Sequence, residues 1–107
     1  MTKITFYKKN NKFFGIECNG HAGYAQNGYD IVCSAISVLC GNLRLGLEKI
    51  LALNATFEQD DETGYFKLSL KEFEDESAQV LFRATYHSML EIANDYPKFV
   101  QVKLKGE

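Results

Sequence analysis

The chain has 107 residues, of which 46% are hydrophobic and 24% are charged, and its formal net charge is −2 at pH 7. This length and composition predict a single globular domain over residues 1–107, with enough apolar side chains to form a buried core. The slightly negative charge argues against a protein that binds nucleic acid mainly through a basic surface. We find no secretory signal and no apolar run near the ~20 residues of a membrane span, so we expect a cytoplasmic protein.

The first elements in chain order are two strands with alternating apolar residues, 3–8 and 13–18. Between them stand Asn10 and Asn11, and asparagine tolerates the left-handed conformations of a tight hairpin turn. The apolar residues predicted to share one face of the second strand are Phe14, Ile16 and Cys18. A glycine-rich loop over residues 19–30 follows.

A long helix is predicted over residues 31–53, because apolar residues recur there every three or four positions. This stripe consists of Val32, Ile36, Leu39, Leu43, Leu47 and Ile50. Asp30 precedes the helix and is a suitable N-cap. Gly41 and Gly46 lie inside it, where each costs about 1 kcal/mol relative to alanine. We expect these glycines to permit close backbone packing, for example against a helix of a partner.

A second hairpin is predicted from residues 56–59 and 65–71, a second helix over residues 76–94, and a last strand over residues 99–104. The element order is therefore ββαββαβ. Hairpins rather than single crossovers favour an α+β fold in two layers, with two helices packed on a mixed or antiparallel sheet.

Cys33 falls in the first turn of the predicted long helix, where backbone N–H groups and the helix dipole favour a thiolate. Cys18 and Cys40 lie on apolar faces and are expected to be core residues. Three cysteines cannot all pair internally, and their spacing matches no zinc site. We therefore expect reduced thiols, with neither metal nor cofactor.

His21 stands in the glycine-rich loop, and an imidazole near neutral pH is a usable general base. A cysteine and a histidine form the minimal unit of a thiol protease, although the spacing does not show whether these two side chains meet. Ser37 lies one helical turn after Cys33 and is either a hydrogen-bond donor near the thiol or bonded to its own helix. Asp30 is either the N-cap or the residue that orients His21.

The motif GHAGYA at residues 20–25, followed by Gly28, Asp30, VCSA at residues 32–35 and Ser37, resembles the ribosomal-processing cysteine protease family, Prp. The resemblance extends over the whole chain in length and element order. It implies an intracellular cysteine endopeptidase that removes a short N-terminal extension from large-subunit ribosomal protein number twenty-seven, so that ribosomes assemble.

The same resemblance implies the roles of individual residues. Cys33 is the expected nucleophile and His21 the expected base, with Asp30 and Ser37 as supporting residues. The expected substrate-gating loop contains Gly20, Gly23 and Gly28. Family members are similar in forming homodimers and in cleaving extended peptides after aromatic residues, so the expected partners are the ribosomal peptide and a second copy, without nucleic acid or membrane.

Two other functions stay open from the residues alone. A non-catalytic ribosome-associated or RNA-binding module could stack bases on Tyr24 and Tyr29, although the negative charge weakens this alternative. A redox protein could use Cys33 and Cys40. Their seven-residue separation corresponds to about 10 Å along a helix, which is too far for a disulfide without unwinding it.

Overall fold

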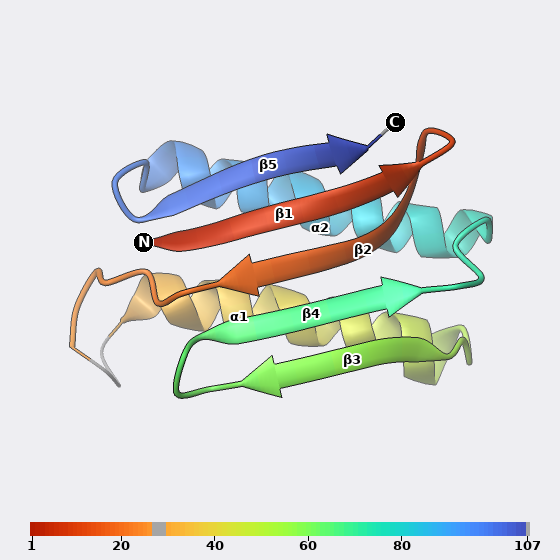
Figure 1. Cartoon of the computed structure of the whole chain (residues 1–107), viewed down its shortest axis with the longest axis horizontal. Helices are drawn as coiled ribbons and strands as arrows, with labels where there is room; N and C mark the ends of the chain where they lie inside the picture. The colour runs from red at the N-terminus through yellow and green to blue at the C-terminus, as the bar shows by residue number, and fades with distance from the viewer. Residues whose placement is uncertain (27–29, 107) are drawn as a thin grey trace.

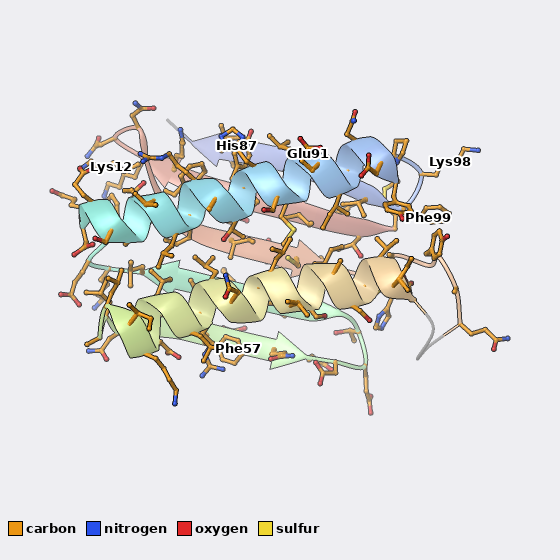
Figure 2. The ribbon with its side chains drawn as sticks, turned by 180° about the vertical axis from the view of Figure 1, so that it is seen from behind. Lys12, Phe57, His87, Glu91, Lys98 and Phe99 are labelled. Carbon is orange, nitrogen blue, oxygen red and sulfur yellow. The ribbon has the colours of Figure 1, made fainter. Side chains whose placement is uncertain are left out.

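The computed structural model describes residues 1–26 and 30–106, which form a five-stranded sheet with helices on one face (Figure 1). The elements are β1 (Thr2–Lys9), β2 (Lys12–Asn19), α1 (Ile31–Leu45), a π-helical turn η1 (Gly46–Ile50), β3 (Ala55–Asp60), β4 (Tyr65–Leu70), α2 (Glu76–Asp95) and β5 (Val100–Gly106). Seen from behind, α1 and α2 lie side by side across the sheet (Figure 2). The predicted α+β class and element order are confirmed.

The strand order is β3-β4-β2-β1-β5. All neighbouring pairs are antiparallel except β1 and β5, which are parallel, so the sheet is mixed. Asn10 and Asn11 have φ angles of 53° and 62°, as a type I′ turn requires, and the predicted β1–β2 hairpin is confirmed.

A β-bulge corrects one part of the predicted sheet. Tyr7 pairs with Gly15 but the next residue, Lys8, pairs with Phe13, so Phe14 is an extra residue in β2. Phe14 therefore packs against Tyr7 on the face away from the helices, whereas Phe13 joins Phe6 in the core. The prediction that Phe14 shares a face with Ile16 and Cys18 is wrong, because a bulge reverses the side-chain alternation.

The bulge is held by a side chain from α2 that the sequence did not single out. Buried Gln79 accepts a hydrogen bond from the Phe13 N–H at 2.8 Å and donates to the Phe13 carbonyl at 2.7 Å. It also donates to the Phe73 carbonyl at 2.5 Å. Gln79 thus bonds both main-chain groups of the residue next to the bulge.

The predicted long helix ends earlier than expected. It passes at Gly46 into the wider π-helical turn η1, which ends at Ile50, and Ala52 then adopts a left-handed conformation with φ 55°. The wider turn rotates the last residues relative to the α-helical stripe. Ile50, which was expected to be buried, is consequently 79% exposed.

The segment Ile31–Ile50 has a mean hydropathy of 1.4 and, by length and composition alone, is long and apolar enough to cross a membrane. This differs from the expectation that no such segment exists. The core helix of a folded domain satisfies the same criterion. Here Val32, Ile36, Leu43 and Leu47 are buried in the core.

Candidate active site

The loop after β2, the β3–β4 turn and the start of α1 lie at the same end of the molecule (Figure 1). Asp30 joins two of these segments. One carboxylate oxygen accepts a hydrogen bond from the Cys33 N–H at 3.0 Å, and the other accepts from the Tyr24 N–H at 3.1 Å. The predicted N-cap is confirmed, and the same side chain fixes part of the preceding loop.

These hydrogen bonds determine the charge of Asp30. Burial raises the pKa of its carboxyl, but hydrogen bonds from Cys33 and from the Tyr24 amide outweigh this effect. The resulting pKa lies below the ordinary value for an aspartate, so Asp30 carries a negative charge at neutral pH.

Cys33 occupies the third position of α1 and is half-buried. Its Sγ accepts a hydrogen bond from the Ala22 N–H at 3.1 Å. Burial raises the pKa of the Cys33 thiol, the Ala22 amide lowers it, and the neighbouring Asp30 carboxylate raises it again, with a net increase. The start of the helix thus gives no net lowering of this thiol pKa, because the Cys33 N–H donates to Asp30 and the Asp30 carboxylate disfavours a thiolate.

His21 is exposed, and its Nε2 lies 2.9 Å from the carbonyl oxygen of Glu62 in the β3–β4 turn. No hydrogen bond joins the His21 ring to the Cys33 thiol, although both residues are among those described. Both side chains nevertheless line the same groove. The structure thus places His21 and Cys33 in one groove, but their side chains are not hydrogen-bonded to each other.

The groove runs between α1 and the β3–β4 hairpin and has a volume of about 910 Å³. Ser37 lies in it, exposed and one helical turn beyond Cys33. Arg44 lies further along the helix, where its guanidinium is 3.7 Å from the ring centre of Phe57 and its Nε donates to Glu48 at 2.8 Å. Figure 2 shows Phe57 beside the later turns of α1.

The three expected loop glycines differ in their surroundings. Gly20 is fixed, since its N–H donates to the Gly64 carbonyl at 3.1 Å and its own carbonyl accepts from the Thr2 hydroxyl at 2.9 Å. Gly23 has a φ of 75° and open space around the position of a Cβ. Gly28 lies outside the described residues.

The other two cysteines lie in the core, as predicted. Cys18 and Cys40 are each 3% exposed, and their sulfur atoms are 3.5 Å apart. A hydrogen bond with Cys40 and burial both raise the pKa of Cys18. Within residues 1–26 and 30–106, no three metal-ligating side chains gather as they would at a metal site.

Several contacts of this site have no signature in the sequence. The amide of Ala22, the carbonyl of Glu62 and the amide of Tyr24 are main-chain groups, which every residue type carries. The ring of Tyr24 packs edge-on against Tyr96 and Phe99, with ring centres 5.4 Å apart in both pairs. These aromatic residues were visible in the sequence, but their contact depends on the tertiary fold.

Comparison with known proteins decides the family. The profile described as "Cysteine protease Prp" matches residues 1–101. The chain belongs to this family. A crystal structure of SMU.848 from Streptococcus mutans is 32% identical, with a TM-score of 0.90 over 100% of this chain and 96% of that one.

Two further structures share the Prp fold. The ribosomal processing protease Prp from S. aureus, in complex with a covalently linked product peptide, is 20% identical with a TM-score of 0.92, over 98% of this chain and 100% of that one. Its complex with a substrate peptide is 19% identical with a TM-score of 0.87 over the same shares. A search of curated proteins returned no significant match.

Proposed function

We propose that the chain is a cysteine endopeptidase in which Cys33 is the nucleophile and His21 the general base. The observation that carries this proposal is the groove that both residues line. All three cysteines border this groove, but Cys33 is half-buried, whereas Cys18 and Cys40 are each 3% exposed and hydrogen-bonded to each other. Membership of a cysteine protease family requires a reachable thiol, and Cys33 meets that requirement best.

In the proposed reaction, His21 takes the proton of the Cys33 thiol while Sγ bonds to the scissile carbonyl carbon. The bond to the leaving amine then breaks, the amine receives the proton from His21, and a thioester remains. A water deprotonated by His21 hydrolyses this thioester and restores the thiol. The Ala22 N–H donates a hydrogen bond to Sγ and so favours the thiolate, whereas the N–H of Cys33 is occupied by Asp30.

The proposal includes a conformational step. The resting thiol has a raised pKa and no bond to His21, so a bound peptide has to bring the two together. Gly20 is held on both sides, whereas Gly23 has open space around it, which supports Gly23 as a point of movement in the proposed gating loop. Ser37, exposed in the groove, is positioned to bond the peptide.

The proposed substrate is the N-terminal extension of large-subunit ribosomal protein number twenty-seven, processed in the cytoplasm during ribosome assembly. Family membership supports this choice, as does the fold shared with a ribosomal processing protease. The groove also has ample volume for several residues of extended peptide. The proposed enzyme acts as a homodimer and requires no cofactor, nucleic acid or membrane.

The decisive experiment incubates the purified protein with the extended ribosomal protein of the same organism and follows the products by mass spectrometry. We expect one N-terminal cleavage by the unsubstituted protein and none by Cys33→Ala or Cys33→Ser. The substitutions leave a folded protein, because the side chain is small and only half-buried. Full cleavage by Cys33→Ala would contradict the assignment, and ribosome binding without any cleavage would favour the non-catalytic alternative.

The role of His21 is tested separately. We expect His21→Ala to lower kcat by a factor on the order of 10² or more, the scale of lost general-base catalysis. The matched control is His87→Ala, since His87 is an exposed histidine on α2, away from the groove (Figure 2). Equal rates for the two variants would mean that another group accepts the thiol proton.

A further inference from the structure

The partner of the His21 ring is a main-chain carbonyl, and this restricts the chemistry of the ring. The oxygen of Glu62 lies 2.9 Å from Nε2. A carbonyl oxygen carries lone pairs and no proton, so it can only accept a hydrogen bond. Nε2 must therefore carry the hydrogen. In a neutral imidazole the other ring nitrogen, Nδ1, then has the free lone pair.

The turn that supplies this carbonyl is attached to the base of the His21 loop. The Gly64 carbonyl accepts a hydrogen bond from the Gly20 N–H at 3.1 Å. Gly64 has a φ of 70°, and a Cβ at this position would lie only 2.8 Å from the Gly20 carbonyl carbon and 3.0 Å from the His21 nitrogen. Only glycine fits this approach without displacing the chain. The turn and the base of the loop are thus packed backbone against backbone.

Asp30, the side chain that the sequence offers as an alternative partner for His21, is already occupied. Both of its carboxylate oxygens accept main-chain hydrogen bonds, from Cys33 and from Tyr24. A carboxylate or amide usually orients the histidine of a thiol or serine hydrolase. Here the Glu62 carbonyl takes the place of that carboxylate or amide as the hydrogen-bond partner of the histidine ring.

We infer, on the basis of the proposed function, that the β3–β4 turn is the orienting element of the active site. The carbonyl of Glu62 holds His21 with the hydrogen on Nε2 and the lone pair on Nδ1, and Gly64 positions that carbonyl. When a bound peptide brings Cys33 Sγ to the His21 ring, Nδ1 takes the proton from the thiol. The imidazolium keeps its Nε2–H hydrogen bond to the Glu62 carbonyl, and this bond is stronger because its donor is now a cation. The proton then passes from Nδ1 to the leaving amine.

The first test needs no turnover. Nitrogen-15 NMR of the histidine-labelled protein, with His87→Gln used to assign the signals, reports which ring nitrogen of His21 is protonated. We expect a protonated Nε2 and an unprotonated Nδ1 above the imidazole titration. A protonated Nδ1 in the folded protein would overturn the inference, whether or not the protein cleaves peptide.

The second test changes the carbonyl itself. Replacing Thr63 by its α-hydroxy analogue turns the Glu62–Thr63 amide into an ester, whose carbonyl is a weaker acceptor. We expect a mixture of His21 tautomers and a kcat lowered at least tenfold, with KM changed less than kcat. A purely structural role of the turn would leave the tautomers unchanged. Unchanged tautomers together with an unchanged kcat would overturn the inference.

Side-chain variants complete the test. Gly64→Ala should lower kcat by a factor on the order of 10², because its Cβ pushes the turn away from the loop. Asn11→Ala is the control for alanine at positive φ in a distant turn, where φ is 62°. If the unsubstituted protein cleaves no peptide while Nε2 is protonated, the proposed function fails and the orientation of His21 stands.

Discussion

Asp30 illustrates how far individual residues could be predicted. Its position before an apolar helix predicted the N-cap, because capping is a local interaction between neighbours in the sequence. The hydrogen bond from the Tyr24 amide and the unfavourable effect of the carboxylate on the thiol depend on how the loop folds back. The identities of Cys33 and His21 were evident, whereas the main-chain groups that hold them were not.

The effect of Asp30 on the thiol is testable. Asp30→Asn keeps an oxygen for the Cys33 amide but removes the charge, which is one cause of the raised pKa of Cys33. We therefore expect the thiol pKa to fall in this variant and the thiolate to form at lower pH. The measurement is thiolate ultraviolet absorbance against pH, with the same titration of Cys33→Ala subtracted. A thiol pKa that rises or stays constant would show that burial alone sets it.

At the scale of elements, hairpins and helices were predicted well because their signals are local. The turn at Asn10 and Asn11, the cap at Asp30 and the apolar stripe of α1 each depend on nearby residues. The bulge at Phe14 and the π-helical turn at Gly46 were not predicted. Both lie against α2, where Gln79 bonds the main chain of Phe13 and Leu81 lies close to Gly46, and a local sequence pattern contains neither contact.

The gating loop gives a second prediction. In the free protein, amides of residues 23–26 should exchange with solvent faster than those of β2, and a bound substrate peptide should slow them. Ordering each residue costs about 1–2 kcal/mol, which the bound peptide has to offset. Hydrogen exchange with mass spectrometry, using Cys33→Ala to prevent turnover, measures this change, and the β4 segment serves as the internal control. Strong protection of residues 23–26 without peptide would argue against a gate.

The two helix glycines form a matched pair for a stability test. A Cβ on Gly46 would lie 2.8 Å from Leu81 Cδ1, whereas a Cβ on Gly41 meets no atom within 4 Å. We expect Gly41→Ala to raise the free energy of unfolding by up to ~1 kcal/mol through helix propensity. Gly46→Ala should lower the free energy of unfolding by about 1 kcal/mol, since the crowding of the new Cβ against Leu81 outweighs the gain in helix propensity.

Urea denaturation measures both values, and Leu81→Ala provides the check. Removing the leucine side chain should cost less stability in the Gly46→Ala background than in the unsubstituted protein. Equal costs in the two backgrounds would mean that Gly46 and Leu81 do not interact. The structure shows the close approach expected of these glycines at Gly46, where the neighbour is Leu81 of α2 in the same chain.

At the scale of the whole molecule, element order was sufficient to predict the class and the two layers. It did not predict the position of β5, because either edge of the sheet can accept a last strand. The outer surface of the helical layer carries exposed apolar side chains, among them Val38, Leu45, Ile50 and Val80. Ile50 and Val80 border an apolar hollow of about 310 Å³ between η1 and α2.

This surface is the proposed homodimer interface, since apolar patches on a folded domain commonly mark contact sites. We expect Ile50→Glu combined with Val80→Glu to convert a dimer to a monomer in size-exclusion chromatography with light scattering. Leu104→Glu, at an exposed position on β5, should leave the mass unchanged. A monomeric unsubstituted protein, or a dimer that survives the double substitution, would contradict this interface.

The parallel pairing of β1 with β5 has a consequence for how the chain folds. Thr2 lies opposite Val100, so the two strands come from the two ends of the described chain. Bringing such distant segments together costs loop-closure entropy, and folds that depend on distant pairings form slowly. Until β5 has been synthesised, β1 presents an open strand edge that invites association with other chains. The sheet is therefore completed only after translation of β5, and a chain that stops before Val100 is prone to aggregate.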